Sequence, residues 1–226
     1  MSLRPLTPLE ARVLGVLIEK QHTVPDTYPL SLNALTLGCN QKTARVPVMD
    51  ASEAEVLTAV DGLKSLSLVF EGSGSRVVKY EHNLPRVLGL PGAAVALLAV
   101  LMLRGPQTSA ELRAHSERLH RFADISSVEG FLQELADKPV PMVVLLPRAP
   151  GAREARWAHL LCGEVAVEVS AFAVANAAGE GSSVAAGEIA ALKAAQALML
   201  DRLEALAARV GHLERELGVA APPQEA

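Results

Sequence analysis

The stretch SEAEVLTAVDGLKSLSLVFEGSGSRVVKYEH, residues 52–82, carries the boundary signals of a helix and a strand pair. Ser52 and Glu55 form a capping-box pattern, which marks the start of a helix. Residues 68–71 and 76–82 are strand-like and flank a turn of glycines and serines. The helix would bury one stripe of apolar residues at helical spacing, namely Val56, Val60 and Leu63.

Two more helices are expected before this segment. Thr7-Pro8 is a good helix start, because threonine caps helices and proline suits the first helical position. This helix is expected to end near Gln21, residues 31–37 predict a short second helix, and residues 39–49 predict an ordered loop. The order helix, helix, helix, hairpin is typical of the winged helix, a helix-turn-helix variant.

The same order occurs a second time in residues 90–160, so the sequence predicts two winged helices in tandem. Such a repeat favours a recognition module over a catalyst. The signals of the second copy are a helix start at Leu90-Pro91, a cap at Thr108 or Ser109, a capping box at Ser126 and Glu129, and strands at 142–146 and 156–162.

The charge of the chain is unevenly distributed. Residues 1–88 have net charge 0, residues 89–160 have +1, and residues 161–226 have -5, which gives the total of -4. Strong nonspecific binding to duplex DNA needs many phosphate contacts from Lys and Arg. The near-neutral copies therefore argue against it.

The polar loop from Asn40 to Arg45 is the strongest candidate binding site. Its donors suit phosphate or carboxylate groups, and they come from Asn40, Gln41, Lys42, Thr43 and Arg45. In the alternative interpretation, Asn40 and Gln41 end a helix and the cations are merely solvated. Cations of the two hairpins are further candidates for phosphate contacts, namely Arg76, Lys79, Arg148 and Arg153.

The third helix of each copy argues against reading of DNA sequence. A recognition helix should offer Arg, Lys, Asn or Gln to base edges. Helix 52–66 has three acidic residues against Lys64, and helix 126–138 has three against Lys138. Both helices would repel phosphates.

Residues beyond 165 differ in character. Residues 166–187 are interpreted as a linker, and residues 219–226 as a disordered tail. Between them, residues 188–218 keep a heptad pattern, with the polar Gln196 at one core position. This pattern predicts a homodimer through a parallel coiled coil, and the alternative is an amphipathic helix that packs on its own domains.

No motif of an enzyme or a cofactor site is recognised. The six histidines are scattered and no Cys-x-x-Cys occurs, so neither a metal nor another cofactor is expected. Cys39 and Cys162 are expected to be reduced thiols of a cytoplasmic protein. A run of about eighteen uncharged apolar residues is missing, so no membrane span is expected.

Several blocks of sequence resemble the YceH-like family of bacterial proteins over residues 6–165. The resemblance implies tandem winged helices in a bacterial cytosolic protein, and it carries no implication for function. The blocks include Glu19-Lys20-Gln21, Tyr28-Pro29-Leu30-Ser31, Cys39-Asn40-Gln41-Lys42-Thr43, Pro47-Val48-Met49 and Leu103-Arg104-Gly105-Pro106-Gln107-Thr108.

These observations predict a mainly α protein with small β-hairpins. Its tandem winged-helix domains would occupy residues 1–88 and 89–165, followed by the C-terminal heptad helix. Two functions stay open, because tandem winged helices serve either use. A DNA-associated regulator that binds duplex DNA weakly through phosphates ranks slightly ahead of a scaffold that binds a protein partner.

Overall fold

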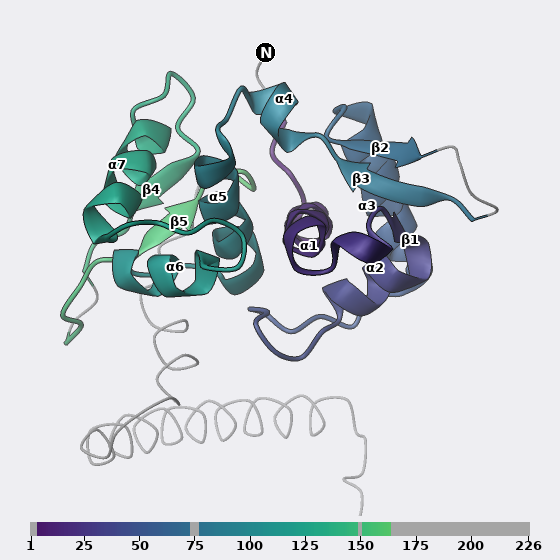
Figure 1. Cartoon of the computed structure of the whole chain (residues 1–226), viewed down its shortest axis with the longest axis horizontal. Helices are drawn as coiled ribbons and strands as arrows, with labels where there is room; N and C mark the ends of the chain where they lie inside the picture. The colour runs from purple at the N-terminus through teal and green to yellow at the C-terminus, as the bar shows by residue number, and fades with distance from the viewer. Residues whose placement is uncertain (1–3, 73–76, 149–150, 164–226) are drawn as a thin grey trace, which may run out of the picture. The chain divides into compact units, whose positions relative to one another are not determined.

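The computed structural model describes residues 4–72, 77–148 and 151–163, all of which belong to one compact unit (Figure 1). It is mainly helical with small antiparallel strand pairs, as the sequence predicted. The expected linker, heptad helix and tail lie outside the described residues, as does Arg76.

The first copy consists of three helices and a small sheet. After α1 (Pro8–Thr23) and the 3-10 turn η1 (Pro25–Thr27), the chain forms β1 (Leu30–Ser31), α2 (Leu32–Cys39), α3 (Glu53–Ser65), β2 (Val69–Gly72) and β3 (Lys79–His82). The sheet order is β1-β3-β2 and both pairings are antiparallel. Tyr80 of β3 therefore faces Leu30 on one side and Glu71 on the other.

The second copy repeats this order after the short helix α4 (Leu84–Leu88). Its elements are α5 (Gly92–Arg104), α6 (Ser109–Ser116), α7 (Ile125–Ala136), β4 (Val143–Leu145) and β5 (Trp157–His159). Gln107 forms an isolated bridge with Trp157, in the place that β1 has in the first copy. Trp157 of β5 also faces Leu145 of β4, so Trp157 corresponds to Tyr80.

Most helix starts lie where the sequence placed them. Thr7, Ser52 and Thr108 each cap a helix in a complete capping box. The box expected at Ser126 is wrong, because Asp124 caps α7 and accepts a hydrogen bond from the Ser127 amide. Aspartate is as good a cap as serine, so the helix begins two residues earlier than expected.

The two copies share one core through their first helices, α1 and α5, which lie side by side (Figure 1). Every residue of α5 from Ala93 to Leu103 is buried, as expected for a helix that is covered on all sides. The helices approach closely at Gly15, where a Cβ atom would lie 3.0 Å from Leu103 Cδ2. The amide of Val46 also donates to the carbonyl of Leu103 over 2.8 Å.

Candidate functional site

The loop that follows α2 is held in place mainly by its own polar side chains. The side-chain amide of Asn40 donates to the carbonyl of Ala51 and accepts from its N–H, both over 2.8 Å. Gln41 donates to the carbonyl and the hydroxyl of Thr43. These contacts use most of the donors that the sequence assigned to a ligand, and Lys42 is left as an exposed cation of the loop.

Arg45 is a structural residue in this fold. Its side chain has no exposed surface and donates to Glu19, over 2.6 Å at the closer contact. Burial raises the pKa of Glu19, but the hydrogen bonds and charge of Arg45 outweigh this effect and hold the pKa below its usual value. A phosphate-binding role does not fit this burial.

A second arginine, Arg12 of α1, is also buried against the loop. It donates to the carbonyl of Cys39 over 3.1 Å and to the carbonyl of Pro47 over 2.6 Å. Burial, together with the charge of Arg45, lowers the pKa of Arg12. Both cysteines are free thiols, and burial raises the pKa of Cys39 to about 12.

The hairpin cations differ in what they offer to a ligand. Lys79 is half-buried in β3. Arg148 and Arg153 are exposed beside each other, and Arg148 Nη1 lies 3.5 Å from the carbonyl oxygen of Arg153. Among the candidates that the structure describes, Lys42, Arg148 and Arg153 are thus the exposed cations.

The outward faces of the third helices, α3 and α7, are acidic, as the sequence indicated. Their exposed carboxylates belong to Glu53, Glu55, Asp61, Glu129, Glu134 and Asp137. Lys64 of α3 is paired, with Nζ 2.5 Å from Glu71 Oε1 and 3.4 Å from Asp61 Oδ1. These faces therefore carry little positive charge that a phosphate could use.

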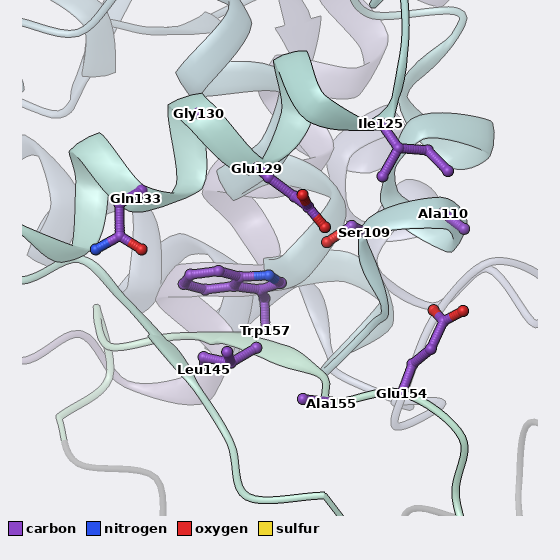
Figure 2. A pocket seen from close by; sticks show the side chains of 10 residues that line it. All are labelled: Ser109, Ala110, Ile125, Glu129, Gly130, Gln133, Leu145, Glu154, Ala155 and Trp157. Atoms are coloured by element: carbon purple, nitrogen blue, oxygen red, sulfur yellow. The ribbon is translucent and has the colours of Figure 1, made fainter.

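A cavity of about 600 Å³, here called the Trp157 groove, opens in the second copy between α6, α7 and the hairpin (Figure 2). Sequence reasoning missed it entirely. Figure 2 shows Glu129 extending from α7 over the indole ring toward Ser109, while Glu154 extends from the hairpin toward Ala110. The groove is lined by Ser109, Ala110, Ile125, Glu129, Gly130, Gln133, Leu145, Glu154, Ala155 and Trp157.

The groove combines an apolar floor with an acidic rim. Trp157, the only tryptophan of the chain, is 6% exposed and lines the groove together with Ile125 and Leu145, which are 41% and 49% exposed. Neither Glu129 nor Glu154 forms an ion pair within the described part of the chain. The single tryptophan was the one signal in the sequence that could have pointed here.

The described residues offer neither a metal-binding cluster nor a membrane-spanning helix. They contain no group of three or more His, Cys, Asp or Glu side chains that could hold a metal ion. None of their helices is long and apolar enough to cross a membrane.

The fold thus defines a mainly α protein built from two copies of one helix–hairpin unit. The chain belongs to the family described as "Protein of unknown function, DUF480", whose model matches residues 6–152. This match confirms the expected family of bacterial proteins, and the resemblance to YceH-like proteins is consistent with it.

Relatives with high identity span nearly the whole chain. A UPF0502 protein of Leptothrix cholodnii is 66% identical over 221 residues, which is 97% of this chain and 99% of that protein. A UPF0502 protein of Burkholderia cenocepacia is 65% identical over 218 residues, which is 96% of this chain and 92% of that protein. The similarity therefore continues beyond the residues of the family model.

Proposed function

We propose that this protein is a protein-interaction scaffold without enzymatic activity, built from two winged helices that present their third helices and hairpins to a protein partner. The observation that carries this proposal is the Trp157 groove, an apolar cleft whose carboxylates have no ion pair among the described residues. Exposed apolar surface with a polar rim, here supplied by Ile125 and Leu145, is typical of protein interaction sites. This ranking reverses the order that the sequence favoured.

The positions of the predicted phosphate-binding cations also favour the scaffold over the DNA-binding regulator. Arg45 is buried against Glu19, and Lys64 is paired on α3. With Lys42, Arg148 and Arg153 as the exposed candidates, the predicted loop and hairpins offer few phosphate contacts. Weak duplex binding follows, because each phosphate contact contributes through counterion release.

Site-specific photo-crosslinking in living cells tests the proposal. A benzoylphenylalanine that replaces Glu134, exposed on α7, should crosslink to a distinct protein partner. The same residue at Asp26, exposed in η1, is the matched control and should not. No crosslinked protein from α7, or an identical pattern from both positions, would contradict the proposal.

Duplex DNA stays as a second candidate ligand because Arg148 and Arg153 lie exposed together on the second hairpin. Anisotropy with mixed-sequence duplexes should show a shallow log-log salt slope, about -2 to -4 per monomer. Arg148→Ala/Arg153→Ala should abolish the signal. Nanomolar binding of one DNA sequence at physiological salt would refute the scaffold proposal and establish a DNA-binding regulator.

We also propose that the heptad pattern of residues 188–218 forms a homodimer. The 3–4 spacing of apolar residues from Ile189 to Leu217 supports it. Light scattering of the full chain at micromolar concentration should give twice the monomer mass, and a monomer would refute it. Gln196→Leu should stabilise the assembly and relax its register.

A further inference from the structure

We infer that the Trp157 groove binds the side chain of a lysine or arginine, presented by a basic segment of the protein partner. The inference rests on the proposed function and names the chemistry that this site recognises. It joins three independent features of the groove, namely its shape, its charge and its counterpart in the first copy.

The shape and lining of the groove suit a long cationic side chain. Lysine and arginine combine an apolar stem with a charged end, so they need an apolar wall and a polar end in one cleft. Ile125 and Leu145 supply exposed apolar walls, and the largely buried Trp157 closes the groove on its inner side. A cavity of about 600 Å³ has room for one such side chain and part of its backbone.

The charge of the groove disfavours phosphate groups, and therefore duplex DNA, as its ligand. Both ionisable side chains of its lining, Glu129 and Glu154, are acidic. The nearby Arg156 is already held by Glu111, with Nη1 3.0 Å from Oε2. A phosphate would be repelled here, whereas the negative charge of both carboxylates attracts a cation.

The first copy has a lysine of its own at the corresponding place. Counting from the helix caps Ser52 and Asp124 aligns Lys64 with Ala136, and the strand pairing aligns Tyr80 with Trp157. Lys64 lies against Glu71 and Asp61, and Glu71 pairs with Tyr80 across β2 and β3. A lysine held by carboxylates, one of which pairs with the aromatic residue of the neighbouring strand, is thus already part of this fold.

The second copy has the aromatic ring and the carboxylates but no such lysine. Ala136 stands where Lys64 would be, and the carboxylates come from different positions, on α7 and on the hairpin. A lysine or arginine from another protein would complete the arrangement that the first copy completes by itself.

Fluorescence of the full-length protein tests the inference, because Trp157 is the only tryptophan. Titration with the tripeptides acetyl-Gly-Lys-Gly-amide and acetyl-Gly-Arg-Gly-amide should change its emission saturably, with dissociation constants of roughly millimolar size for so small a ligand. The same peptide with an acetylated lysine keeps the shape and removes the charge. It should give no saturable change.

Paired variants separate the groove from general surface charge. Glu129→Gln/Glu154→Gln should weaken binding at least about tenfold. Asp26→Asn/Glu117→Gln removes two exposed charges elsewhere, and its affinity should stay within about twofold. Circular dichroism checks that both double variants are folded.

Three outcomes would overturn the inference: no saturable change with either cationic peptide, equal binding of the acetylated peptide, or equal loss in both double variants. If the cationic peptides fail while α7 still crosslinks to a protein partner, the groove assignment falls and the scaffold stands. If they bind while α7 crosslinks to nothing, the site stands and the scaffold falls.

Discussion

Lys64 in the first copy and Ala136 in the second occupy the same position along the third helix, counted from the helix cap, yet the surfaces around them differ. Lys64 connects α3 to β2 through Glu71, and Asn33 of α2 donates to Glu53 of α3 over 3.1 Å. These contacts tie the elements of the first copy together. The second copy has a cavity between the matching elements.

The comparison shows that one backbone plan can carry different surfaces. Both copies bury the same stripe on the third helix, which in the first copy is Val56, Val60 and Leu63 and in the second Val128, Leu132 and Leu135. The plan is therefore maintained by the core. What each copy can bind depends on a few side chains outside that core.

The largest expected effect on stability comes from breaking the buried ion pair between Arg45 and Glu19 in the first copy. Arg45→Ala leaves Glu19 half-buried without its main cation and should lower the free energy of unfolding by about 3–5 kcal/mol. Lys42→Ala, at an exposed position of the same loop, should change it by less than about 0.5 kcal/mol. Urea unfolding followed by circular dichroism measures both, and a similar small effect for the two variants would contradict the structural role of Arg45.

A feature that the copies share should make stability depend on pH. His82 and His159 lie two residues after Tyr80 and Trp157, and burial lowers the pKa of each to about 4. Because the unfolded chain then binds protons more readily, stability is full above about pH 6.5 and is lost as pH falls toward 4.

Between pH 7 and pH 5 each of these histidines should cost about 2 kcal/mol of unfolding free energy. Urea unfolding at the two pH values measures it, with His82→Gln and His159→Gln as separate variants. Each variant should remove about half of the histidine-dependent loss. An unchanged pH dependence in either variant would refute the role of that histidine.

A smaller effect distinguishes the two ways of capping the third helices. Asp124→Ala should lower the melting temperature by about 3 °C, because the Ser127 amide loses its acceptor. Ser52→Ala should do the same in the first copy. Ser126→Ala should change it by less than about 1 °C, and an equal loss at Ser126 would restore the capping box that the sequence suggested.

The smallest expected effect on stability comes from making the second copy resemble the first. Ala136→Lys places a lysine three residues after Gln133 of the groove lining, at a partly buried position, and should leave the melting temperature within about 2 °C, because surface ion pairs contribute little. It should nevertheless weaken binding of the lysine tripeptide severalfold by occupying its site. Ala136→Gln is the uncharged control. Equal peptide binding by the two variants would show that a lysine at position 136 does not compete for the groove, contrary to the analogy with Lys64.

The helices and hairpins were predictable because their signals are local. Thr7, Ser52 and Thr108 bind amides three residues away in the chain, so a short sequence window contains both partners. The strand β1 was missed, since two residues are too few to show a pattern. Its position depends on pairing with β3, about fifty residues later.

The error at Ser126 shows where a local pattern stops being sufficient. Aspartate and serine both cap helices, and the choice depends on how the preceding loop enters the helix. Here Phe122 packs on Phe131, with ring centroids 5.9 Å apart, just before Asp124. The earlier start releases Glu129 from a capping role and leaves its carboxylate at the groove.

The sequence by itself determined the helical class, the repeat, the family and the acidic character of the third helices, because these depend on composition and on neighbours within a few residues. Only the tertiary structure decided that Arg45 pairs with Glu19, which lies 26 residues away in the chain, and that Trp157 shares a cavity with Ser109 and Glu129. Those contacts join residues far apart in the chain, and packing of the core, which no local pattern encodes, brings them together.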